Sequence, residues 1–204
     1  RLANDPSLPD SSRLWAAAAL AWVDGKAGAA QLARLASDTT LHGSFRVEAA
    51  RALAEVDDEN GAAHLVRLAN DPSLPDSSRL WAAAALAWVD GKAGAAQLAR
   101  LASDTTLHGS FRVEAARALA EVDDENGAAH LVRLANDPSL PDSSRLWAAA
   151  ALAWVDGKAG AAQLARLASD TTLHGSFRVE AARALAAIDR GASVRGSLNE
   201  QTRS

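Results

Sequence analysis

Tryptophan and glutamate recur at positions where they could contact a partner molecule. Trp15 and Trp22 are seven residues apart, which is two turns, or about 10.5 Å, along an α-helix. At the corresponding positions 33 residues later stand Glu48 and Glu55. Indole rings attract cations and pack on proline or aromatic side chains, and carboxylates attract basic groups. This pattern favours a groove that binds an extended peptide or protein segment.

The same residues repeat along the chain, and two interpretations of the tryptophans stay open. The indoles either stand in water along the groove, or cover an alanine-rich surface and pack between helix layers as part of the core. The expected binding face consists of Trp15, Trp22, Glu48, Arg51, Glu55, Trp81, Trp88, Glu114, Arg117, Glu121, Trp147, Trp154, Glu180 and Arg183.

Histidines are the other side chains that could bind a metal or transfer protons. None of the five belongs to an H-x-x-x-H motif, and the chain has no cysteine. We therefore expect surface histidines and no metal site. These histidines are His42, His64, His108, His130 and His174.

The remaining motifs argue against catalysis. The acidic turn 57–59 lacks the alternate-residue spacing of a calcium loop. Residues 25–28 read G-K-A-G, which is not the G-x-x-x-x-G-K-[ST] phosphate loop. Ser11, Ser12 and Ser44 stand where they would cap helices, with no histidine and acid placed to activate them. The sequence predicts a protein that is not an enzyme and needs no cofactor.

Amphipathic helices must position these side chains. Between residues 44 and 56, the apolar side chains fall on one arc of a helix, and Glu48, Arg51 and Glu55 fall on the opposite arc. A related helix is expected from Ser11 or Ser12 to residue 23, and a shorter one from about 28 to 37. Residues 24–26 and 57–61 have the composition of turns. No stretch alternates with the period of a strand.

The chain is a tandem repeat. Residues 1–66 recur unchanged as 67–132, and residues 133–186 copy 1–54; each 66-residue copy divides into two halves of 33 that agree at 18 positions. Seventeen residues in each 66 are alanine, so one helical hairpin buries little apolar surface and must pack on its neighbours. The sequence predicts one all-α solenoid of about six hairpins over residues 1–190, in copies 1–66, 67–132 and 133–190. A polar, disordered tail is expected over 191–204.

The repeated unit resembles a known family. Residues 32–38, a loop, and residues 46–53 are similar to HEAT-like repeats of the phycobilisome-lyase type, in which a short apolar helix ends in Asp and a longer one reads roughly V-R-x-x-A-A-x-A-L. The resemblance covers residues 1 to about 189 and implies that the longer helices form a concave face. Lyases of that family handle bilin chromophores, an activity that the fold alone does not carry.

The resemblance also implies a ladder of Asp–Arg hydrogen bonds between successive layers. We expect this ladder to be structural rather than catalytic, since an active site is rarely repeated six times. The corresponding residues here are Arg13, Arg46, Arg79, Arg112, Arg145 and Arg178, with Asp5, Asp38, Asp71, Asp104, Asp137 and Asp170.

Composition limits the partners that we expect. A net charge of -4 argues against binding to nucleic acid, and no apolar run is long enough to span a bilayer. No targeting segment is visible, which leaves the cytoplasm as the default compartment. Because the chain lacks methionine and begins at Arg1, we expect it to be part of a longer protein.

The identity of the copies supports a second interpretation of function. It indicates recent amplification or engineering, and the alternative function is a structural module without a ligand of its own. Such a module could self-associate head to tail through an apolar end formed by Leu2, Leu8, Leu14 and Leu20. We expect a monomer or weak dimer.

Overall fold

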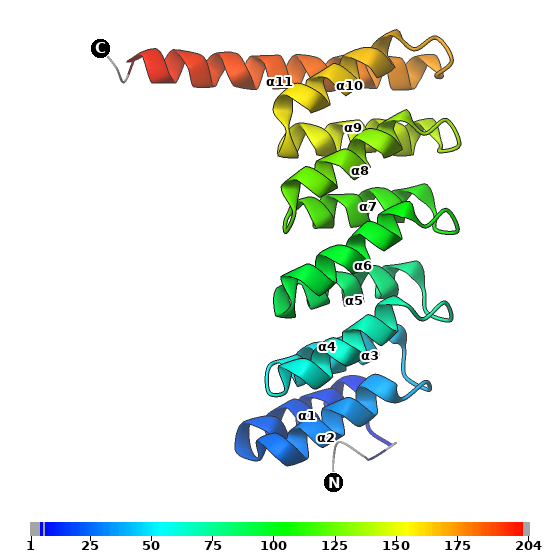
Figure 1. Ribbon diagram of the computed structural model, residues 1–204, viewed down its shortest axis with the longest axis vertical. Coiled ribbons are helices and arrows are strands. Elements are labelled where there is room, and N and C mark those ends of the chain that lie inside the picture. Colours follow the sequence, from blue (N-terminus) through cyan, green and yellow to red (C-terminus); the bar gives the residue numbers. More distant parts are fainter. Residues whose placement is uncertain (1–4, 6, 202–204) are drawn as a thin grey trace. The chain divides into compact units, whose positions relative to one another are not determined.

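The computed structural model describes residue 5 and residues 7–201, with side chains through residue 188 and at Arg190. This described part is all-α and contains no strand (Figure 1). Its helices are α1 Asp10–Val23, α2 Gly25–Ser37, α3 Gly43–Ala54, α4 Asp58–Ala69, α5 Asp76–Val89, α6 Gly91–Ser103, α7 Gly109–Ala120, α8 Asp124–Asn136, α9 Asp142–Val155, α10 Gly157–Ser169 and α11 Gly175–Gln201.

The chain divides into two compact units, residues 1–100 and 101–204, with the division inside α6. In the first unit each helix from α1 to α4 packs on the next, and α3 also packs on α1 and α5. In the second unit each helix from α7 to α10 packs on the next, and α9 also packs on α7 and α11. Each unit is thus a two-layered α-solenoid stack of helical hairpins, with odd-numbered helices in one layer and even-numbered helices in the other.

Leucine and alanine form the core of each unit. Leu32, Leu53 and Leu65 are fully buried, as are the small side chains Ala49 and Ala50 of α3. Alanine at these positions allows neighbouring helices to approach closely, and the leucines fill the space that remains. The binary pattern of the sequence therefore predicts the helices, but the buried faces only in part. Of the apolar arc expected in residues 44–56, Ala49 and Leu53 are buried, whereas Val56 is 45% exposed.

One glycine per hairpin permits a close crossing that the sequence pattern does not reveal. A Cβ atom at Gly61 of α4 would overlap the backbone of Ala54 in α3. The same overlap recurs between Gly28 and Ala21. Both glycines have negative φ, as do all glycines in the described residues. They are required for space and not for an unusual backbone conformation.

The helices begin at different residues from those expected. Asp24 and Asp57 are N-caps whose carboxylates accept the N–H groups of Ala27 and Asn60, at 3.0 and 3.1 Å. Because each Asp caps the helix that follows it, most residues of the turns expected at 24–26 and 57–61 are already helical.

The serines expected as caps lie inside helices. His42 is the N-cap of α3, and its Nδ1 accepts the N–H of Ser44 at 3.3 Å. The N-cap of α1 is Pro9, which makes no side-chain cap hydrogen bond, so Ser11 and Ser12 are already helical. Proline fixes φ near the value that a helix entrance needs, which allows α1 to begin before the serines.

The C-terminal end of the described chain differs from the expected tail, whereas the N-terminal end agrees with the expected uncovered leucines. The backbone of α11 continues as helix to Gln201, past Gly191, where the sequence analysis places the beginning of the tail. No proline follows Gly191, and extending an existing helix costs far less than starting one. At the other end, Leu14 and Leu20 are half-buried, whereas their counterparts Leu80 and Leu86 are buried. Leu2 lies outside the described residues.

Candidate functional site

The tryptophans of the odd-numbered helices are exposed. The second member of each pair stands almost wholly in water: Trp22, Trp88 and Trp154 are 88, 92 and 93% exposed. The first members, Trp15, Trp81 and Trp147, are exposed to decreasing extents. Of the two interpretations that the sequence leaves open, the structure therefore favours indoles in water over indoles packed between layers.

The helix between two tryptophan-bearing helices carries a charged triplet. On α3, Arg51 Nη2 lies 2.9 Å from Glu48 Oε2, and Arg51 Nη1 lies 3.1 Å from Glu55 Oε1. These pairs are one helical turn apart and exposed, so each contributes only a few tenths of a kcal/mol. The Glu48 carboxylate nevertheless raises the pKa of Arg51. The triplet keeps one excess negative charge.

The same arrangement recurs on α7, and α11 has part of it. Arg117 pairs with both Glu114 and Glu121. On α11, Glu180 and Arg183 are exposed, and no ion pair joins them within the described residues. Ala187 stands where the third charged residue would be. The expected acidic layer is therefore complete on α3 and α7 only.

A recess beside Trp88 brings indole and carboxylate together. It has a volume of about 540 Å³ and lies among α3, the first turn of α4, and α5. Trp88, Ala85 and Ala54 supply apolar surface, and Glu55 and Asp58 supply negative charge. Asp58 makes no ion pair with any described residue, so its charge is available to a ligand.

The second unit contains the equivalent recess, and Trp22 borders a third. The recess of the second unit measures about 520 Å³ and includes Trp154, Glu121 and Asp124. In the first unit, Trp22 and Glu55 border a smaller recess of about 250 Å³ between α1 and α3. Glu55 thus faces one tryptophan on each side. An indole ring beside a carboxylate is suited to a cationic side chain.

The Asp–Arg pairs connect neighbouring hairpins within each unit. Arg46 Nη2 lies 3.6 Å from Asp71 Oδ2, and Arg46 Nε donates to the Ala36 carbonyl at the end of α2. The other oxygen of Asp71 accepts the N–H and hydroxyl of Ser73, which lowers the pKa of Asp71, with smaller effects from Arg46 and Arg67. The pair therefore organises the loop as well as the stacking.

Most of the other expected ladder residues behave alike. Asp5, in contrast, accepts hydrogen bonds from Ser7. Arg178 donates a hydrogen bond to the Ala168 carbonyl. Arg79 pairs with Asp76 within α5, and Asp104 binds Thr106 in its own loop. The pairs seen within a unit are Arg13–Asp38, Arg46–Asp71, Arg112–Asp137 and Arg145–Asp170.

Two of the histidines are not at the surface, contrary to expectation. His64 and His130 are only 9 and 7% exposed. They lie on the faces of α4 and α8 that also carry the buried leucines. His42, His108 and His174 are exposed, and they act at the beginnings of α3, α7 and α11. Because histidine occurs on both apolar and polar faces, its type alone gave no signal of this difference.

Neither a metal centre nor a membrane span is found in the part of the chain that the structure describes. No three histidine or acidic side chains there are grouped closely enough to hold a metal ion. None of the helices searched combines the length and the hydropathy needed to cross a bilayer. Comparisons of the chain with models of protein families, with curated proteins and with solved structures find no match.

Proposed function

We propose that the chain is a non-catalytic scaffold of HEAT-like repeats that binds an extended, basic segment of a partner protein. The binding face is the tryptophan–carboxylate face, formed by the exposed Trp, Glu and Arg side chains of the odd-numbered helices. One observation carries the proposal: Trp22, Trp88 and Trp154 are exposed and each borders a recess that also contains a glutamate.

The chemistry of the face selects a basic ligand. A cation above an indole gains about 0.5–2 kcal/mol, with more when water is excluded. Glu55 and Asp58 add Coulomb attraction beside Trp88. Arg51, which also lines that recess, is already paired with glutamates. Lysine or arginine flanked by apolar or proline residues therefore complements the recess. An acidic segment would be repelled.

The packing of the layers supports an extended ligand rather than a compact one. Within each unit the odd-numbered helices pack more extensively on one another than the even-numbered helices do. Such an arrangement is expected of the inner layer of a curved stack. Inner surfaces of helical-repeat proteins commonly accommodate extended segments.

A peptide titration followed by tryptophan fluorescence tests this function. The probes are an extended peptide with lysines separated by proline and leucine, and the same peptide with glutamate in place of lysine. We expect saturable binding of the lysine peptide, weakened by salt because exposed charges are screened, and none of the glutamate peptide. Trp88→Ala should weaken binding about 2- to 30-fold, the equivalent of one cation–π contact.

A control substitution comes from the end of α1. Val23→Ala removes an apolar side chain that is as exposed as Trp22 but lines none of the three recesses, and it should leave the affinity unchanged. Equal binding of the lysine and glutamate peptides would contradict the proposal. Absence of binding to any extended peptide would favour the structural module without a ligand.

A further inference from the structure

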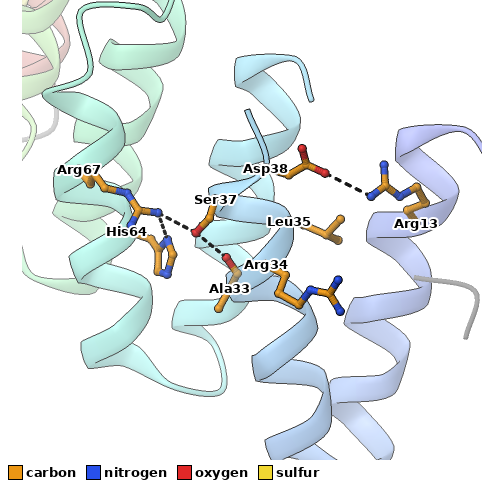
Figure 2. A pocket seen from close by; sticks show the side chains of 8 residues that line it. All are labelled: Arg13, Ala33, Arg34, Leu35, Ser37, Asp38, His64 and Arg67. Atoms are coloured by element: carbon orange, nitrogen blue, oxygen red, sulfur yellow. Dashed lines mark hydrogen bonds and ion pairs between the residues drawn. The ribbon is translucent and has the colours of Figure 1, made fainter. Parts of the chain in front are cut away.

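Another recess lies at the other end of the helices from Trp22. It occupies about 560 Å³ next to α1, α2 and α4. Figure 2 shows a histidine, a serine hydroxyl, a carboxylate and three guanidinium groups around it. The polar residues are Arg13, Arg34, Ser37, Asp38, His64 and Arg67. Positive charge therefore predominates here, whereas the tryptophan–carboxylate face is acidic.

The charge of Arg67 is not neutralised by an ion pair. Its Nη2 donates to Ser37 Oγ at 2.9 Å and lies 2.6 Å from His64 Nδ1. No carboxylate of the described residues comes within ion-pair distance of it. The charge of Arg67 contributes to the lowered pKa of Asp71 from a greater distance, but the ion-pair partner of Asp71 is Arg46. A guanidinium group surrounded by neutral acceptors retains the capacity to bind an anion.

The contact with Arg67 also determines the state of His64. A guanidinium group can only donate, so His64 Nδ1 must accept, and the ring carries its proton on Nε2. Burial lowers the pKa of His64, and the charge of Arg67 lowers it further. The ring is thus held neutral beside a cation. An anion bound between the two would favour the protonated ring, which would then donate a second hydrogen bond.

The other cations of this recess are less suited to a ligand. Arg13 is engaged by Asp38 and Asp10, at 3.4 and 3.6 Å. The Arg34 guanidinium extends away from Arg67 and His64, toward Arg13 (Figure 2). The atoms that remain for a ligand are those of Ser37, His64 and Arg67.

The second unit places the same three residue types together. Arg133 Nη2 lies 2.7 Å from His130 Nδ1 and 2.8 Å from its Nε2, and Arg133 and His130 line a recess of about 250 Å³ with Ser103. Burial and Arg133 lower the pKa of His130. Arg112 in that recess is paired with Asp137, whereas Arg133 has no carboxylate partner among the residues described. The cluster is therefore a feature of the repeat.

We propose that each Ser–His–Arg cluster, Ser37–His64–Arg67 and Ser103–His130–Arg133, binds a tetrahedral oxyanion, namely phosphate or a phosphorylated side chain. The arginine supplies paired N–H donors, and the histidine supplies a second positive charge. The Ser37 hydroxyl donates to the Ala33 carbonyl at 2.9 Å, so it must exchange this acceptor before it can donate to a third oxygen of the anion. This site is independent of the tryptophan–carboxylate face and could be present even if that face binds nothing.

The histidine rings provide a direct readout. Their pH titrations would be followed by NMR in the full chain, in inorganic phosphate and in sodium chloride of equal ionic strength. Phosphate should raise the titration midpoints of His64 and His130 by about 1 pH unit, since an adjacent opposite charge favours the protonated form. The exposed rings of His42, His108 and His174 should not respond and serve as internal controls.

Two substitutions connect the response to the clusters. Arg67→Gln should abolish the phosphate response of His64 and preserve that of His130, and Arg133→Gln should do the reverse. The preserved response also reports that the chain remains folded. The proposal is overturned if all five rings respond alike, if chloride produces the same change, or if both single variants respond as the unaltered chain does.

A phosphoserine peptide and its unphosphorylated form distinguish the two sources of the anion. Half-saturation by the phosphopeptide at a tenfold lower concentration than inorganic phosphate would indicate a phosphorylated side chain. Equal concentrations would indicate free phosphate. A response of the two buried histidines to the unphosphorylated peptide alone would contradict both.

Discussion

Replacing Gly61 with alanine tests the close helix crossing that shapes each hairpin. In an exposed helix this change stabilises by up to about 1 kcal/mol, because alanine is the better helix former. Here the added Cβ would overlap the Ala54 backbone, so α3 and α4 must separate. Overpacking of this kind costs about 1–3 kcal/mol. We therefore expect Gly61→Ala to destabilise the chain by about 1–3 kcal/mol.

Gly25 provides the matched control. It is also near a helix start, and a Cβ placed on it meets no atom within 4 Å. Gly25→Ala should stabilise by about 0.4–1 kcal/mol through the unfolded state. Urea denaturation followed by circular dichroism, with hydrogen exchange of α3 and α4 to localise the effect, would measure both variants. Stabilisation of similar size in both would refute the close-crossing argument.

Four further substitutions probe the ladder, an exposed ion pair, the caps and the buried histidine. Arg46→Ala should destabilise by about 1–3 kcal/mol in denaturant melts, because it removes a buried side chain and leaves the Ala36 carbonyl without its donor. Arg51→Ala, in exposed pairs, should cost at most about 1 kcal/mol. Asp57→Ala should cost about 1 kcal/mol and fray the start of α4 in hydrogen exchange. The pKa of His64 is lowered from 6.5, so as pH falls past 6.5 the unfolded chain binds a proton that the folded chain does not. Stability should therefore decrease as the pH decreases in this window. His64→Gln should make that slope less steep in melts between pH 7 and pH 5, and the contribution of His130 should remain.

The sequence predicts the helical architecture well because its signals are local and repeated. The apolar arc of residues 44–56 gives α3, and the fixed period of the copies gives the hairpins that pack on one another. The helix beginnings were less predictable. Ser44 has a side chain suited to an N-cap, yet His42 occupies that position, and loop geometry rather than residue type decides between them.

The candidate sites depend on neighbours that a single helix does not reveal. The polar arc of its helix suggests that Trp88 is exposed, but only the structure shows that Glu55 and Asp58 line the same recess. Likewise, the sequence of α4 alone does not show that His64 and Arg67 lie beside Ser37 of α2. Such contacts depend on how hairpins stack, and neither helical period nor residue type encodes them directly.

Acrylamide quenching of tryptophan emission, on a sample shown to be monomeric and with increasing lysine peptide, tests the proposed binding face most directly. We expect red-shifted emission that is readily quenched in the free chain and becomes protected as the peptide binds. Emission that is already blue-shifted and protected in the free monomer would show that the indoles are packed. Quenching unchanged by saturating peptide would show that the tryptophan–carboxylate face does not bind it.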